Sequence, residues 1–307
     1  MAVTLHLVGC GRAGRSLARL WADQGAFSIG RVVNRRIESA QAAVDFIGQG
    51  RAAAGLDGIA AEDWLMLGVP DGQLESAVAA LAAGLDRPPA LAFHVSGAEP
   101  ADVLRRLGCP VASVHPVCPF SDPERALRTF AGSYALGEGD PAALDAVLPA
   151  FEAIGAETMR FEPADKRRYH AATIAASNFL NVLDDLALDL AESAGLETGQ
   201  ALKVIVALQR AGLSNIEQAG PQQALTGPIE RGDRVVCERL LATPGVAGDP
   251  LFLALARAAV DLADRKHGRQ AEDRENPLRE LFGAPNVQSP DVQSPNLQSP
   301  GDRDGGV

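Results

Sequence analysis

The segment Gly9-Cys10-Gly11-Arg12-Ala13-Gly14 constrains the fold more than any other part of the chain. It lies between an apolar run, Val3–Val8, that predicts a strand and an Ala/Leu/Arg segment, Arg15–Asp23, that predicts a helix. A G-x-G-x-x-G pattern in this context is typical of the first turn of a dinucleotide-binding fold. The glycines allow a tight turn, a close approach to a pyrophosphate and close helix packing, and the helix N-terminus faces the phosphates. A glycine-rich turn that binds nothing is the alternative.

The end of the next predicted strand, Phe27–Val33, indicates which dinucleotide fits. In NAD-binding proteins of this kind, an acidic residue about twenty positions beyond the glycines holds the ribose 2′-hydroxyl. Here that position holds Asn34, followed by Arg35 and Arg36. No carboxylate would repel a 2′-phosphate, and two guanidinium groups are available to pair with it. The sequence therefore predicts an NADP(H) site, with arginines that are merely solvated as the alternative.

Composition excludes several classes of function. The net charge of −11 over 307 residues argues against nucleic-acid and anionic membrane partners, which need a basic surface. No apolar run reaches the roughly 18–20 residues of a membrane span. The four cysteines lie far apart and without metal-ligand spacing, so we expect reduced thiols, no metal site and a soluble cytoplasmic protein. They are Cys10, Cys109, Cys118 and Cys237.

Residues 1–160 alternate strand-like and helix-like segments, which predicts a doubly wound, parallel Rossmann-type sheet. Three of the predicted strands end in Val69-Pro70, Ser96-Gly97 and His115-Pro116. In open α/β sheets, ligands bind beyond the carboxyl ends of the strands. We therefore expect Val69, Pro70, Ser96 and Gly97 to contact the cofactor, and His115 to lie at the ligand edge.

The pattern changes to helices after residue 160. One long helix is predicted from Asp165 to Ala194, followed by shorter ones, so residues 161–269 are expected to form an all-helical domain. Residues 270–307 are polar and repeat a Val/Leu-Gln-Ser-Pro unit, which predicts a disordered tail. The substrate site is expected in the cleft between the two domains.

The long helix carries polar residues at spacings of three and four, including Lys166 and His170, with Asn178 beside the stripe. Lys166 or His170 could deliver a proton while hydride is transferred, and Asn178 could orient the substrate. His115 could act as an acid, a base or a hydrogen-bond partner, since the ordinary pKa of histidine lies near neutrality. A solvated helix start and a structural His115 are the alternatives.

Several segments together resemble the Rossmann-like DUF2520 proteins of the 6-phosphogluconate dehydrogenase-like superfamily, related to pyrroline-5-carboxylate reductase and prephenate dehydrogenase. The more specific segments are K-R-R-Y-H-A-A-T-I-A-A-S-N from Lys166 and L-T-G-P-I-E-R-G-D from Leu225. The resemblance covers about residues 1–265. It implies an N-terminal NADP-binding domain and a helical C-terminal domain that often dimerises.

Two functions remain open at this stage. The first is an NADP(H)-dependent oxidoreductase that acts on a small polar carbonyl, imine or hydroxy compound. The second is a non-catalytic protein that senses NADPH or binds a partner. The polar stripe and His115 favour the enzyme, because a sensor needs no proton donor beside the nicotinamide.

Overall fold

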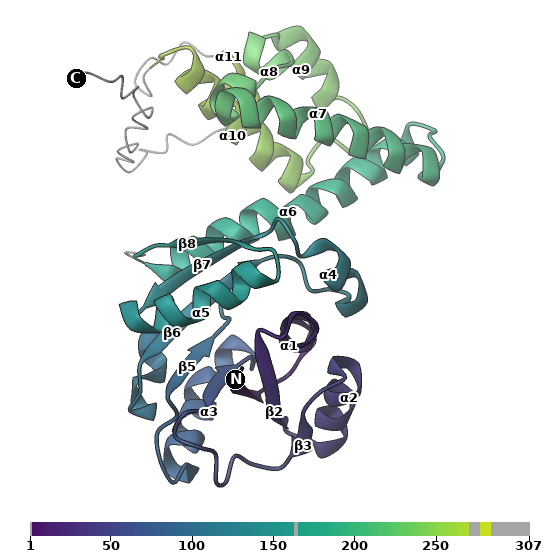
Figure 1. The fold of residues 1–307 in the computed structure, drawn as a ribbon. Helices are drawn as coiled ribbons and strands as arrows, with labels where there is room; N and C mark the ends of the chain where they lie inside the picture. The colour runs from purple at the N-terminus through teal and green to yellow at the C-terminus, as the bar shows by residue number, and fades with distance from the viewer. Residues whose placement is uncertain (1, 163–164, 270–276, 284–307) are drawn as a thin grey trace, which may run out of the picture. The chain divides into compact units, whose positions relative to one another are not determined.

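A computed structural model describes residues 2–162, 165–269 and 277–283 of the chain (Figure 1). The chain divides into two compact units, Met1–Leu180 and Asn181–Val307. The long helix α6 (Lys166–Ser193) crosses this division, so its first fifteen residues belong to unit 1. The predicted boundary between residues 160 and 161 lies just before this helix.

Unit 1 is built on an eight-stranded sheet with the order β3-β2-β1-β4-β5-β6-β7-β8. The order reverses direction at β1, which is the doubly wound arrangement predicted from the sequence. Strands β1 to β6 are mutually parallel, whereas β7 pairs antiparallel with β6 and parallel with β8. The predicted doubly wound parallel sheet is therefore confirmed for β1 to β6, and the last two strands run in the opposite direction. The strands are β1 Val3–Val8, β2 Phe27–Val33, β3 Arg51–Ala53, β4 Trp64–Leu67, β5 Leu91–His94, β6 Val111–Val117, β7 Tyr134–Gly139 and β8 Glu157–Arg160.

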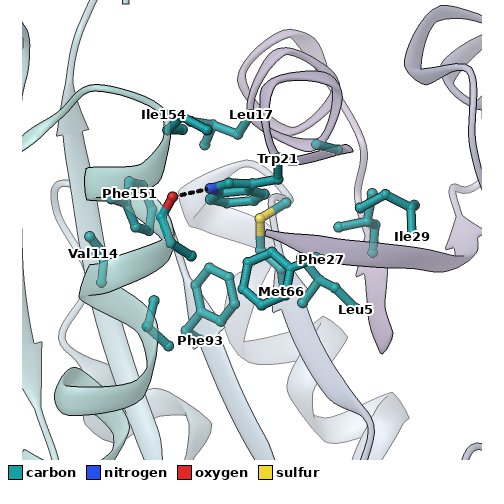
Figure 2. Packing of buried hydrophobic residues seen from close by; sticks show 14 of the residues in the cluster. Leu5, Leu17, Trp21, Phe27, Ile29, Met66, Phe93, Val114, Phe151 and Ile154 are labelled. Carbon is teal, nitrogen blue, oxygen red and sulfur yellow. Dashed lines mark hydrogen bonds between the residues drawn. The ribbon is translucent and has the colours of Figure 1, made fainter. Parts of the chain in front are cut away.

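Two buried apolar clusters cover the opposite faces of the sheet. Alternate residues of a strand point to opposite faces of the sheet. On β4, Met66 therefore packs in the first cluster, whereas its neighbours Leu65 and Leu67 pack in the second. Trp21 lies at the centre of the first cluster, where its ring packs edge-on against Phe151 at a centroid distance of 5.2 Å and its Nε1–H donates to the Ala150 carbonyl (Figure 2). The helices of unit 1 before α6 are α1 Arg12–Gln24, α2 Ile37–Ile47, α3 Asp71–Gly84, the 3-10 helix η1 Ala101–Leu107, α4 Pro123–Thr129 and α5 Pro141–Ala153.

A buried histidine stabilises an irregularity between β1 and β2. The pairing shifts by one residue after Leu5, and the His6 ring fills the space beside Gly30. His6 Nδ1 accepts a hydrogen bond from the Arg31 backbone N–H at 2.8 Å, and Nε2 donates to the Asp63 carboxylate at 2.9 Å. The His6 ring thus accepts a hydrogen bond from the Arg31 amide, at the point where the shifted pairing interrupts the hydrogen bonds between β1 and β2. This is a structural role.

Strand β6 is longer than the sequence pattern predicts. The apolar run indicates an end at Val114, yet the strand continues to Val117 because its last residues pair with β7. His115 lies opposite Leu136 in this pairing. It is therefore held within a strand and not just beyond the end of one.

Unit 2 consists of the remainder of α6 and of the helices α7 Thr198–Ala224, α8 Pro228–Arg231, α9 Arg234–Leu241, α10 Pro250–Lys266 and α11 Pro277–Leu281. The sequence predicts two helices, at about 198–211 and 213–219, but α7 is continuous through Gly212 and breaks at Gly220, whose φ is 72°. It also predicts a loop over residues 226–233, where the short helix α8 forms.

Part of the predicted tail contributes to the core of unit 2. Leu278 and Phe282 are buried in a small cluster with Cys237 and Val260. The Arg279 guanidinium also pairs with Asp264. The prediction of disorder from residue 270 onward is therefore wrong for residues 277–283, and the rest of it lies outside the described residues.

Candidate functional site

The glycine loop connects β1 to α1, and its three glycines meet different requirements. Gly9 has a φ of +79°, and a side chain there would place its Cβ 2.4 Å from Val69 Cγ1. A Cβ on Gly14 would lie 3.4 Å from the Gly9 carbonyl oxygen. A Cβ on Gly11 would meet nothing within 4 Å. The absence of a side chain at Gly9 thus allows the loop to lie against Val69, just after β4, whereas the space beside Gly11 is open.

The N-terminus of α1 lies open beside that space. No side chain caps the helix at Gly11, and its first turn contains no acidic residue. The Cys10 backbone N–H donates to Asn34 Oδ1 at 2.6 Å, so the Asn34 side chain bridges the end of β2 and the loop. The Arg12 guanidinium donates to the Ser121 carbonyl. Burial raises the pKa of the Cys10 thiol to about 12, which leaves the thiol protonated at neutral pH.

Arg35 and Arg36 follow Asn34 at the start of α2, and both are exposed. Within the described parts of the chain, neither guanidinium makes a hydrogen bond or an ion pair. Among the described residues, Arg36 forms no ion pair with Glu38 or Asp45, the carboxylates nearest to it on α2. Two unpaired cations therefore stand beside the open N-terminus of α1.

A polar cluster gathers on one face of the sheet, beneath the first turns of α6. His115 Nδ1 lies 2.7 Å from the Tyr169 hydroxyl, and the two rings meet edge-on with centroids 5.6 Å apart. The His170 ring lies 6.3 Å from the His115 ring. At Gly97, a Cβ would be 2.9 Å from His115 Nε2 and 2.8 Å from His170 Nδ1. The absence of a side chain at Gly97 therefore makes room for both histidines.

Lys166 occupies the buried side of this cluster. Its side chain is 4% exposed, and Nζ pairs with the Glu138 carboxylate at 3.1 Å and donates to Ser113 Oγ. Glu138 Oε1 also accepts the Ala101 backbone N–H at 2.7 Å. Burial lowers the pKa of Lys166, and the Glu138 carboxylate opposes that shift. The Lys166 ammonium group thus binds Glu138 and Ser113 in the interior of the protein.

The environment keeps both sheet histidines of this region neutral. Burial, followed by the charges of Lys166 and His170, lowers the pKa of His115 to about 4, against a smaller opposing influence of Asp71. Burial and Lys166 lower the pKa of His94 to about 3. His94 is fully buried and bonds the Pro100 carbonyl, in keeping with the packed position that the sequence indicates. At neutral pH, His115 therefore presents one N–H and one lone pair.

The remaining predicted residues lie at the edge of this cluster or outside it. Ser96 is buried, and its hydroxyl accepts the backbone N–H groups of Ala98 and Glu99, so it stabilises its own turn. Val69 and Pro70 form the turn from β4 into α3. Asn178 lies on α6 two turns beyond His170, and it is exposed.

Sequence reasoning missed Ser113 and Glu138, and it placed Tyr169 beside the polar stripe without a specific role. Ser113 and Glu138 lie directly opposite each other on β6 and β7, and nothing in the sequence indicates that these strands pair. Tyr169 lies beside the polar stripe, but only the fold brings its hydroxyl to His115, 54 residues away. The four cysteines are free. No helix among the described residues is long and apolar enough to cross a membrane.

Comparisons with known proteins agree with this architecture. The family described as "Domain of unknown function (DUF2520)" matches residues 133–259. No curated protein matches the chain. Among solved structures, a protein of Thermotoga maritima is 25% identical, with a TM-score of 0.66 over 86% of this chain and 99% of its own.

Two enzymes are similar at lower identity. A pyrroline-5-carboxylate reductase of Coxiella burnetii is 16% identical, with a TM-score of 0.55 over 87% of this chain and 99% of its own. A reductive aminase of Aspergillus terreus, in complex with NADPH and ethyl levulinate, is 19% identical, with a TM-score of 0.56 over 92% of both chains. At these identities the likeness shows the fold, a Rossmann-type sheet with a helical C-terminal region.

Proposed function

From the premise that this chain is a Rossmann-like, DUF2520 domain-containing protein, we propose that it is an NADP(H)-dependent oxidoreductase. The substrate that we propose is a small polar carbonyl, imine or hydroxy compound. The observation that carries the proposal is the uncapped N-terminus of α1 beside the open Gly11 position, with the unpaired Arg35 and Arg36 at the end of β2. The reductive aminase of the same fold, whose structure is in complex with NADPH, supports it.

The residues of the loop fit a dinucleotide phosphate. The helix N-terminus offers N–H groups and a positive dipole end, and no carboxylate in the first turn opposes an anion. Gly9, Cys10, Gly11, Arg12, Ala13 and Gly14 would hold the pyrophosphate; Asn34, Arg35 and Arg36 would hold the 2′-phosphorylated ribose; and Val69, Pro70, Ser96 and Gly97 would border the rest of the cofactor. When bound, NADP(H) supplies or accepts the hydride.

The polar cluster supplies groups for binding a substrate. His115 is neutral and can hydrogen-bond an oxygen or nitrogen at the reacting carbon. His170 lies beside it and is the remaining candidate for a proton donor. Lys166 is paired inside the fold, so we assign to it an electrostatic influence on His115 and not direct proton transfer. A substrate-orienting role of Asn178 and a site in the cleft between the domains stay predictions.

We expect NADPH to bind more tightly than NADH. A charge-assisted hydrogen bond from Arg35 or Arg36 to the 2′-phosphate is absent with NADH and contributes about 1.5–3 kcal/mol. Calorimetric titration of both cofactors measures the difference. Alanine at both arginines should remove the preference and leave NADH affinity unchanged, with Arg51→Ala on β3 as the control. Equal affinities in the unchanged protein would contradict the assignment.

An assay of hydride transfer distinguishes the proposed oxidoreductase from the alternative, a non-catalytic protein that senses NADPH. NADPH absorbance is followed with small ketones, imines and, in the reverse direction with NADP, hydroxy acids. Turnover that His115→Ala abolishes without loss of NADPH binding supports the oxidoreductase. Tight NADPH binding without turnover on any of these classes favours the sensor.

We also propose that the protein is a homodimer joined through the helical unit. On α7 only Ala201 is buried, while Leu202, Val204, Leu208 and Leu213 are 47–73% exposed. So many exposed apolar side chains on one helix are typical of a surface that a partner covers. Sedimentation should give about twice the 32.0 kDa of one chain, and Leu208→Glu with Leu213→Glu should give the monomer. A monomeric unchanged protein would refute this proposal.

A further inference from the structure

Tyr169 contacts His115 directly in the polar cluster, yet the proposed function gives it no role. The Tyr169 hydroxyl lies 2.7 Å from His115 Nδ1. The Tyr169 ring is held by Phe161, with centroids 5.0 Å apart, and by its edge-on packing against the His115 ring. Tyr169 is half-buried, and burial raises the pKa of its hydroxyl, so the phenol carries its proton at neutral pH.

Two arrangements of the protons are compatible with this distance, and they differ in strength. If Nδ1 carried the proton, it would donate to a phenol oxygen, which is a weak acceptor, and the Tyr169 proton would have no partner among the described residues. If the hydroxyl donates, the more acidic donor meets the more basic acceptor, and both groups are satisfied. The second arrangement is the stronger hydrogen bond.

We propose that Tyr169 is a positioning residue that donates its hydroxyl proton to His115 Nδ1 and thereby holds His115 in the tautomer with the proton on Nε2. His115 Nε2 has no hydrogen-bond partner among the described residues and faces the position where Gly97 lacks a side chain. The N–H that Tyr169 enforces therefore points to the space beside Gly97.

This tautomer narrows the role of the site. An Nε2–H donor matches an acceptor atom of the substrate, such as a carbonyl oxygen or the oxygen of a hydroxyl group. It does not match a base that removes a proton through Nε2. This consequence for the substrate rests on the proposed oxidoreductase function, whereas the tautomer itself does not.

The tautomer can be read directly by long-range proton–nitrogen correlation on the 15N-labelled full chain, without cofactor or substrate. The chain has five histidines, and loss of one set of signals in His115→Gln assigns His115. We expect a protonated Nε2 and an unprotonated Nδ1. Tyr169→Phe should convert this single tautomer to a mixture in which the Nδ1–H form is at least several-fold more populated. Tyr134→Phe, at the other tyrosine of the chain, should change nothing.

A titration gives a second reading of the same contact. A hydrogen bond donated to the neutral ring favours that ring, so its loss in Tyr169→Phe should raise the pKa of His115, while burial still holds that pKa below its ordinary value. Lys166 and His170 on α6 and Asp71 on α3 also face His115 and are unchanged in this variant.

A His115 in the unchanged protein with its proton on Nδ1 would overturn the proposal, as would a Tyr169→Phe protein that keeps the single Nε2–H tautomer. If Tyr169→Phe fails to fold, the spectrum of the unchanged protein decides alone. Both spectra are recorded without cofactor or substrate, so a negative result in the hydride-transfer assay would not change them. Each of the two proposals can therefore be refuted without the other.

Discussion

Replacing Gly9 by alanine should destabilise the protein by about 2–5 kcal/mol. The added Cβ would lie 2.4 Å from Val69 Cγ1 and 2.6 Å from the Val69 backbone nitrogen, distances that require the β4 turn to move. Overpacking of this kind costs about 1–3 kcal/mol. The φ of +79° adds about 1–2 kcal/mol for a residue with a side chain. Chemical denaturation followed by far-UV circular dichroism measures the loss.

Gly11→Ala is the matched control for Gly9→Ala, in the same loop and with the same added methyl group. The φ of Gly11 is −77°, and a Cβ there meets nothing within 4 Å. We expect a change in unfolding free energy of less than about 1 kcal/mol. Because the methyl group would occupy the space assigned to the pyrophosphate, NADPH affinity should fall. Equal destabilisation by both substitutions would contradict the packing argument, and unchanged NADPH affinity in Gly11→Ala would contradict the cofactor site.

Glu138→Leu should destabilise the protein by about 3–5 kcal/mol. The substitution removes the partner of the Lys166 ammonium, whose side chain is 4% exposed, and leaves a buried charge without compensation. It also removes the acceptor of the Ala101 backbone N–H. The measurement is the midpoint of chemical denaturation at constant slope.

A double substitution distinguishes the ion pair from packing. In Lys166→Met with Glu138→Leu, no buried charge remains, so much of the lost stability should return. The Ala101 N–H still lacks its acceptor, so recovery should be incomplete. Asp23→Ala, which breaks the exposed pair with Arg19, should change the unfolding free energy by less than about 1 kcal/mol. A double variant no more stable than Glu138→Leu alone would show that the charge is not the cause.

Local sequence patterns determined the first half of the sheet and the glycine loop. The strands Val3–Val8 and Phe27–Val33 have their predicted bounds, because each is rich in apolar residues and is followed by glycine or a polar residue. The long helix was predicted within one residue at each end, because Gly195 with a φ of +97° ends it. Likewise, the resemblance to DUF2520 proteins is confirmed, since it depends on short contiguous motifs.

Only the tertiary structure shows which residues of β6, β7 and α6 come together in the polar cluster. The sequence leaves Lys166 open between a proton donor and a solvated helix start, whereas in the fold β7 brings Glu138 within 3.1 Å of its ammonium group. The antiparallel pairing of β7 with β6 also extends β6 past His115. From the sequence pattern alone, this strand is predicted to end at Val114. Such contacts join residues 28 to 54 positions apart, and periodicity records only which face of its own element a residue occupies. Which faces meet depends on how the strands pair and how the helices pack, and these are properties of the folded chain as a whole.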